Sequence, residues 1–174
     1  MAEQSNDAAS LPAGIDPHNT LVMETTPGRI VIKLHNDVAP EHAERLKLLA
    51  RERFYDDVPF HRVIDGFMAQ TGDGQYGNGN GGSKYPDLKA EFSSMPFMRG
   101  TVGMARASSP NSANSQFFIM FEEGSFLDGK YTVVGEVVRG MDVVDKLKRG
   151  EPPADPDRII RMQVAADLKR DVKR

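Results

Sequence analysis

The sequence of 174 residues contains no cysteine, which excludes disulfide bonds, thiol nucleophiles and metal sites built from thiolates. Long hydrophobic runs are also missing. The longest uninterrupted apolar stretch is Phe117–Phe121, whereas a membrane-spanning helix needs about 20 residues. No lysine or arginine precedes Arg29, so the N-terminus lacks the positively charged region of a secretory signal. We therefore expect a cytoplasmic protein that makes no contact with a membrane.

The formal net charge is −3, and the sequence has no block of lysine or arginine. A nucleic acid is therefore not expected as a partner, because its recognition relies on a basic surface. The histidines show no spacing typical of metal ligands, so we expect no metal site; they are His18, His35, His42 and His61. A chain of this length is expected to form one domain with a sizeable core.

A glycine-rich stretch, Gly72–Gly77, matches the dinucleotide-binding fingerprint G-x-G-x-x-G. The fingerprint works only when its last glycine opens a helix whose N-terminus meets the pyrophosphate, and here further Gly and Asn residues follow instead. Lys84 follows a serine rather than a glycine, so the phosphate-loop pattern fails as well. The sequence predicts a flexible rim loop at this place and no bound cofactor.

The chain divides into a central domain and two tails. Residues 1–19 have no hydrophobic period and are expected to form a flexible N-terminal tail, and residues 169–174 a charged C-terminal tail. The domain, residues 20–168, is expected to contain helices at 40–51 and 141–149. The expected strands lie at residues 21–25, 29–34, 58–64, 67–71, 101–105, 116–120, 131–138 and 159–166. This pattern predicts a mainly β fold, a closed eight-stranded antiparallel β-barrel capped by two α-helices.

The most informative stretch is residues 60–70, Phe-His-Arg-Val-Ile-Asp-Gly-Phe-Met-Ala-Gln, where an Asp-Gly turn between two strand-like runs predicts a hairpin. Strict alternation puts Arg62 on the same face as Phe60 and Ile64. A guanidinium on an apolar face is costly unless it has a function, although an Arg whose stem packs while its head reaches water is the ordinary alternative. Gln70 is a second polar group in aromatic and thioether surroundings. Two such groups on apolar surface are typical of a binding site.

Two further motifs follow in chain order, Ser-Gln-Phe-Phe-Ile at residues 115–119 and Phe-Leu-Asp-Gly-Lys at residues 126–130. Each alone is typical of an ordinary strand or turn. Together with the first motif, Phe-His-Arg-Val-Ile-x-Gly-Phe-Met-x-Gln-x-Gly-Asp, they resemble the cyclophilin family of peptidyl-prolyl cis-trans isomerases in its single-domain, bacterial-like form. The resemblance runs from about residue 19 to residue 166.

The resemblance implies a role for each matching residue. Arg62 matches the catalytic arginine of the family, Gln70 the glutamine that holds the substrate backbone, and Phe118 a wall of the pocket for the proline ring. The other implied substrate-binding residues are His61, Phe67, Met68, Ala105, Arg106, Gln116, Phe126, Leu127 and Tyr131. Many members have Asn at the position of Arg106 and His at that of Tyr131, so the role of the Arg106 side chain stays open.

The chemistry of Arg62 also follows from the residues themselves. Rotation about an X-Pro bond breaks amide resonance and crosses a barrier of about 20 kcal/mol. In the twisted state the prolyl nitrogen regains a lone pair, so a donor aimed at it stabilises the transition state more than either planar state. The planar, charged guanidinium of Arg62 is suited to this role. The reaction needs no nucleophile, metal or cofactor.

We therefore expect a monomeric enzyme that isomerises X-Pro bonds in proline-containing peptides and in unfolded or folding proteins. Many family members carry a Trp at the position of Phe126, and its indole N–H donates a hydrogen bond to cyclosporin. Phe126 has no donor, so the resemblance implies weakened cyclosporin binding. Two alternatives stay open. One is a non-catalytic peptide-binding module on the same scaffold, and the other is a general chaperone whose isomerase activity is incidental.

Overall fold

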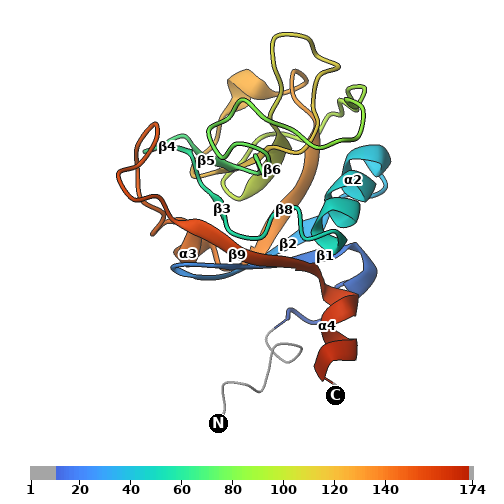
Figure 1. The fold of residues 1–174 in the computed structure, drawn as a ribbon. Coiled ribbons are helices and arrows are strands. Elements are labelled where there is room, and N and C mark those ends of the chain that lie inside the picture. The colour runs from blue at the N-terminus through green and yellow to red at the C-terminus, as the bar shows by residue number, and fades with distance from the viewer. Residues whose placement is uncertain (1–10, 173–174) are drawn as a thin grey trace.

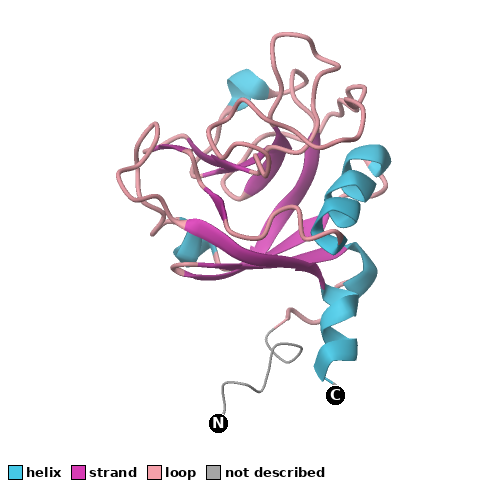
Figure 2. Cartoon of the chain, in the orientation of Figure 1, coloured by secondary structure: helices cyan, strands magenta, loops and turns pink. Residues whose placement is uncertain are grey.

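The computed structural model describes residues 11–172, whose strands form one antiparallel sheet in the order β3-β9-β1-β2-β8-β6-β7-β5-β4 (Figure 1). The strands are β1 (Thr20–Thr25), β2 (Gly28–Leu34), β3 (Val58–Pro59), β4 (Arg62–Ile64), β5 (Met68–Thr71), β6 (Thr101–Met104), β7 (Phe117–Met120), β8 (Val133–Arg139) and β9 (Arg158–Val164). The helices are α2 (Pro40–Arg51), α3 (Met141–Val144) and α4 (Ala165–Val172), with single 3₁₀ turns η2 (Pro17–Asn19) and η3 (Ser125–Leu127). Long loops cover the end of the sheet opposite α4 (Figure 2).

The sheet is curled but open, so the predicted closed eight-stranded barrel is wrong, although the mainly β class is confirmed. Its two end strands, β3 and β4, are consecutive in the chain, and no ladder joins them in the described part of the protein. The sequence predicted one strand at residues 58–64. That strand is interrupted at Phe60, whose N–H donates to the carbonyl of Asp157 at 2.8 Å, and the residues after it pair with the other end of the sheet.

The helices also differ from the prediction. Helix α2 has the predicted bounds, and the carboxylate of Glu91 accepts the N–H groups of its first turn, at 3.2 Å from Glu41 and 3.0 Å from His42. Helix α3 is shorter than predicted, because the chain after it turns away and the N–H of Lys148 donates to the Asp157 carboxylate. A third helix, α4, replaces the end of the last predicted strand, and none of the described helices is long and apolar enough to cross a membrane.

The predicted tails lie partly outside the described residues, which leave out 1–10 and 173–174. Within the N-terminal segment, Leu11 packs against Val22, Ala165 and Leu168, and residues 17–19 form η2. Within the C-terminal segment, α4 continues as far as Val172. The described parts of both segments therefore meet beside β1.

The main core lies between α2 and the sheet. Leu46 and Leu49 of α2 are each 1% exposed and belong to the same cluster as apolar side chains from most strands. These strand residues include Leu21, Ile32, Val63, Ala69, Val102, Ile119, Val134 and Met162. A second, smaller apolar cluster contains Met68, Phe97, Phe118, Met120, Leu127 and Val133. Because residues that alternate along β5 and β7 belong to different clusters, the strands separate the two.

The glycine-rich loop after β5 is organised by one buried carboxylate, that of Asp73, which is 0% exposed. It accepts hydrogen bonds of 2.9–3.1 Å from the backbone N–H groups of Gln75, Tyr76, Asn78, Gly79 and Gly81. Burial alone would raise the pKa of Asp73, but the N–H donors outweigh it and hold the pKa below the ordinary value. A flexible loop was predicted here, and the structure shows a loop wrapped around a charge.

We expect Asp73→Asn to destabilise the fold by about 2–4 kcal/mol, because the charge-assisted bonds to the loop are lost. A depressed pKa in the folded state stabilises the fold above the unfolded pKa, and this stability disappears as pH falls through the folded value. The difference between wild type and variant should therefore shrink below about pH 4. Urea unfolding between pH 3 and pH 7 measures it.

A matched control is Asp65→Asn, which removes a carboxylate whose side chain is 82% exposed. It should change stability by less than about 1 kcal/mol. Equal losses in the two variants, or a loss in the Asp73 variant that does not depend on pH, would contradict the role given to Asp73.

Candidate active site

Strand register places the predicted catalytic side chains in one row across the sheet. Arg62 on β4 lies opposite Gln70 on β5, Gln70 lies opposite Phe118 on β7, and Phe118 lies opposite Gly103 on β6. Directly opposed residues of antiparallel strands point to the same face of a sheet. The residues next to this row point to the main core and are Val63, Ala69, Ile119 and Val102.

The alternation predicted for residues 60–64 is only partly right. Arg62 and Ile64 do share a strand face, and Ile64 packs against the smaller cluster. Phe60 belongs to the main core and is 0% exposed, because it lies before β4 starts, where its N–H bonds to the carbonyl of Asp157. Arg62 therefore stands on the sheet face that bears the smaller cluster, and its side chain is 42% exposed.

A cavity of about 330 Å³, which we call the central cavity, lies over this row. Its lining residues are His61, Arg62, Phe67, Met68, Gln70, Asn78, Gly79, Asn80, Ala105, Arg106, Phe118, Leu127 and Tyr131. The sequence missed Asn78, Gly79 and Asn80. The glycine-rich composition marked them as a rim loop, but it did not show that bonds to Asp73 and Gln116 hold that loop beside the cavity.

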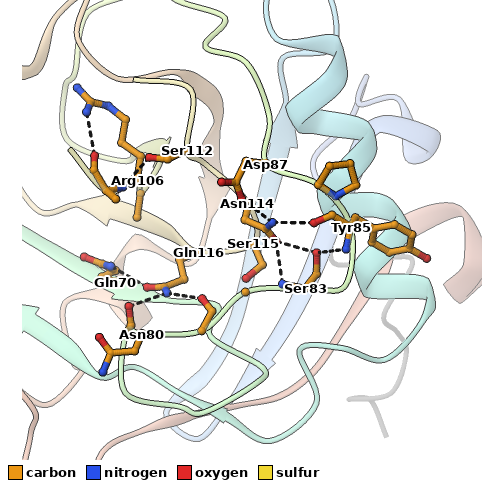
Figure 3. A pocket seen from close by; sticks show the side chains of 16 residues that line it. Gln70, Asn80, Ser83, Tyr85, Asp87, Arg106, Ser112, Asn114, Ser115 and Gln116 are labelled. Atoms are coloured by element: carbon orange, nitrogen blue, oxygen red, sulfur yellow. Dashed lines mark hydrogen bonds between the residues drawn. The ribbon is translucent and has the colours of Figure 1, made fainter. Parts of the chain in front are cut away.

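Two predicted residues lie outside the lining of the central cavity. Gln116 lines a neighbouring side cavity of about 600 Å³, drawn in Figure 3. The two cavities share lining residues Gln70, Gly79, Asn80, Ala105 and Arg106. Phe126 is 62% exposed, and its ring lies beside that of Phe67 with the centroids 5.6 Å apart. Phe126 therefore extends the aromatic surface of the rim outwards.

The ring of Phe118 is fixed by neighbouring aromatic groups. It stacks on Phe97 with centroids 5.9 Å apart and meets Tyr131 edge-on at 6.0 Å. A Cβ at Gly103 would lie 2.6 Å from the Phe118 ring and 2.7 Å from the Phe97 ring. A side chain at position 103 is therefore excluded, and the glycine lets both rings pack onto β6.

Arg106 closes one side of the central cavity. Its guanidinium lies over the Tyr131 ring, 4.3 Å from the centroid. It also donates to backbone carbonyls, at 2.8 Å to Lys130, 3.0 Å to Ala107 and 3.2 Å to Ser108. The sequence left the role of this side chain open, and the contacts show that it ties the loop after β6 to the loop that carries Tyr131.

A chain of polar side chains crosses the floor of both cavities, and we call it the polar chain. Arg62 Nη1 donates to Gln70 Oε1 at 3.2 Å, and Gln70 Nε2 donates to Gln116 Oε1 at 3.0 Å. Gln116 Nε2 then donates to the carbonyls of Gly79 and Gly81 at 3.0 and 2.9 Å (Figure 3). Because arginine only donates and a carbonyl only accepts, both ends fix which way each amide points.

His61 lies under the rim loop and is 7% exposed. Neither ring nitrogen has a hydrogen-bond partner among the described residues. Burial lowers the pKa of His61, and the Arg62 charge lowers it further, while the Asp73 carboxylate opposes both. At neutral pH the imidazole is therefore uncharged, and it contributes a packed wall of the cavity rather than a charge.

The described residues contain no group of three or more His, Asp or Glu side chains that could hold a metal ion. The G-x-G-x-x-G stretch wraps around the Asp73 carboxylate, whose negative charge would repel a phosphate. The arrangement thus offers a fixed cation, hydrogen-bonding amides and an apolar wall, and it can orient and polarise a bound amide group.

Known proteins are similar to this chain in sequence and in fold. The family model described as cyclophilin type peptidyl-prolyl cis-trans isomerase/CLD matches residues 20–164. A probable peptidyl-prolyl cis-trans isomerase from Brucella suis is 52% identical over an alignment of 177 residues, gaps included, that covers 93% of this chain and 90% of that protein. Peptidyl-prolyl cis-trans isomerase B from Escherichia coli is 40% identical over 136 residues, which cover 74% of this chain and 83% of that protein.

Solved structures agree with the sequence matches. Cyclophilin AquaCyp293 from Hirschia baltica superposes with a TM-score of 0.83 at 31% identity, covering 88% of this chain and 76% of that chain. A cyclophilin type isomerase from Cryptosporidium parvum, solved in the presence of the dipeptide Ala-Pro, has a TM-score of 0.77 at 26% identity and covers 83% of this chain and 98% of that chain. The chain thus belongs to the cyclophilin-type peptidyl-prolyl cis-trans isomerase family.

Proposed function

We propose that this member of the family isomerises X-Pro bonds in the central cavity, with Arg62 as the donor to the prolyl nitrogen. The single observation that supports this most is the row of directly opposed residues. It sets the guanidinium of Arg62, the amide of Gln70 and the ring of Phe118 side by side on one face of the sheet. A proline ring against Phe118 then has its amide nitrogen on the side of Arg62.

The donor is available in the geometry observed. Arg62 Nη1 is bonded to Gln70 and Nε to Glu151, and no described residue accepts a hydrogen bond from Nη2. As the X-Pro bond twists, the prolyl nitrogen becomes a better acceptor, so an N–H from Nη2 stabilises the twisted state selectively. A charge-assisted hydrogen bond contributes about 1.5–3 kcal/mol, which corresponds to roughly 10- to 150-fold in rate.

The cavity contributes orientation and a dry environment. Phe67, Met68, Phe118 and Leu127 form an apolar wall for the proline ring, and Met68 and Phe118 are 2% and 5% exposed. Removing water from the amide disfavours its polar planar form, and holding the ring fixes the rotation axis against Arg62. Gln70 and the backbone near Ala105 are proposed to hold the carbonyl side of the substrate.

Proline-containing peptides and unfolded or folding proteins are the proposed substrates, and a monomer in the cytoplasm is the proposed state. The dipeptide in the Cryptosporidium structure supports a proline-containing ligand for this fold. A non-catalytic binding module is the less favoured alternative, because it needs neither the guanidinium nor its fixed orientation. Such a module would bind the peptide without accelerating isomerisation.

The first prediction for this site concerns Arg62. Arg62→Ala should lower kcat/KM for an Ala-Pro peptide about 10- to 150-fold, because the donor to the prolyl nitrogen is lost. Arg62→Lys should also be impaired, since an ammonium cannot reproduce the planar fork. A protease-coupled isomerisation assay measures both, with thermal unfolding to confirm that the variants fold.

The matched control for these variants is Arg51→Ala. Arg51 is an arginine on α2 that pairs with Asp167 and does not line either cavity. Its removal should leave kcat/KM unchanged. Full activity in Arg62→Ala would overturn the assignment of the donor.

A second prediction concerns metals. The proposed mechanism uses only side chains and backbone, so dialysis against EDTA should change kcat/KM by less than about twofold. The dialysed protein is assayed with and without added zinc or magnesium. Activity that disappears and returns with either metal would show a site that this mechanism lacks.

A third prediction concerns cyclosporin, for which Phe126 provides an aromatic surface without a donor. Phe126→Trp should tighten binding about three- to twelvefold through one added hydrogen bond of about 0.5–1.5 kcal/mol, while kcat/KM for a short peptide hardly changes. Titrating both proteins with the drug while following isomerisation gives the two inhibition constants. If they are equal, Phe126 does not set drug sensitivity.

A further inference from the structure

We propose that Glu151 is a positioning residue for Arg62, so that the guanidinium is held from two sides before substrate binds. This inference rests on the proposed function of Arg62. Arg62 Nε donates to Glu151 Oε1 at 3.2 Å, while Nη1 donates to Gln70 Oε1 at 3.2 Å. The sequence gives no sign of the first contact, because the two residues are 89 positions apart.

The backbone brings Glu151 to this place. Gly150 pairs with Val63, the residue after Arg62, through two hydrogen bonds of 2.8 Å, one in each direction. Gly150 has a φ of 143°, and a Cβ there would lie 2.5 Å from Cα of Pro153. Only glycine therefore allows the chain to turn back directly after this pair. The backbone directly before Glu151 is thus bonded to the strand that carries Arg62.

The loop that carries Glu151 is also held at its far end. One Asp157 carboxylate oxygen accepts the N–H of Lys148 at 2.9 Å, and the other accepts the hydroxyl of Thr26 at 2.7 Å. The carbonyl of Asp157 accepts the N–H of Phe60 at 2.8 Å. Both ends of the loop are therefore bonded to segments that flank the site, which lowers the conformational freedom that Glu151 loses when it pairs with Arg62.

Two acceptors on different nitrogens fix the plane of the guanidinium. Gln70 alone fixes one atom, and the group can then rotate about that contact, since the Arg62 side chain is 42% exposed. When Glu151 also accepts from Nε, the direction in which the remaining nitrogen, Nη2, points is fixed. Nη2 has no acceptor among the described residues. The contacts with Gln70 and Glu151 therefore hold in place the donor that the proposed mechanism uses. A donor that is already in place lowers the cost of reaching the transition state.

An exposed ion pair contributes little to stability, so its effect should appear in catalysis and not in folding. Arg62 acts on the twisted amide, so loss of its orientation should lower kcat and leave KM almost unchanged. Glutamine keeps an oxygen acceptor for Nε and loses the charge. Glu151→Gln should therefore restore most of the activity that Glu151→Ala loses.

The experiment compares kcat and KM of Glu151→Ala, Glu151→Gln and the control Lys148→Ala. The control breaks the exposed pair of Lys148 with Asp155 in the same loop without touching Arg62. Glu151→Ala should lower kcat about 3- to 30-fold, and the control should not. Both alanine variants should melt within about 4 °C of wild type. Equal kcat values for Glu151→Ala and wild type would overturn the proposal.

A double-mutant cycle tests whether Glu151 acts through Arg62. In an Arg62→Ala background, Glu151→Ala should have no further effect on kcat. A full additional loss there would overturn the positioning role, because Glu151 would then act by another route.

An NMR measurement separates this inference from the proposed function. The Nε–H resonance of Arg62 should shift and broaden in Glu151→Ala and return towards the wild-type position in Glu151→Gln. Unchanged Arg62 resonances in the alanine variant would overturn the contact itself. If the wild-type protein proves inactive while the resonance responds, the contact is supported and the proposed function fails.

Discussion

The arrangement of the site depends on one constraint, the antiparallel register of β4, β5, β7 and β6. If one of these strands shifted by one residue, its residue in the row would point into the main core, and a core residue would point to the face of the site. Arg62, Gln70 and Phe118 therefore share a face only while Val63, Ala69 and Ile119 fill the core. The hydrophobic core and the site are specified together, because they occupy alternate positions of the same strands.

The polar chain connects this row to the loops around it. Asp73 holds the rim loop, the carbonyls of that loop fix Gln116, and Gln116 fixes Gln70 against Arg62. Both side-chain amides of the polar chain, those of Gln70 and Gln116, have their oxygen and their nitrogen bonded, which avoids the cost of unpaired polar groups beside an apolar cavity. Such a chain has few alternative arrangements, so the guanidinium is oriented before a substrate arrives.

Local sequence signals predicted the local structure well. The Asp-Gly turn at 65–66 gave the hairpin of β4 and β5, and Pro40 marked the start of α2. The closed barrel failed because residues 58–64 look like one strand, whereas Phe60 bonds to Asp157 and divides that run between the two ends of the sheet. Backbone bonds to a residue almost a hundred positions away leave no local pattern, so periodicity cannot reveal such a break.

The sequence by itself determined the family resemblance, the mainly β class and most of the side chains around the central cavity, because these depend on motifs and short-range alternation; Asn78, Gly79 and Asn80 were missed. Tertiary structure decided the open sheet, the rim loop wrapped around Asp73 and the contact between Arg62 and Glu151. Each of these is made by hydrogen bonds whose partners are chosen by folding and not by spacing. A buried acidic residue is written with the same letter as an exposed residue of its type, and only its neighbours in space distinguish the two.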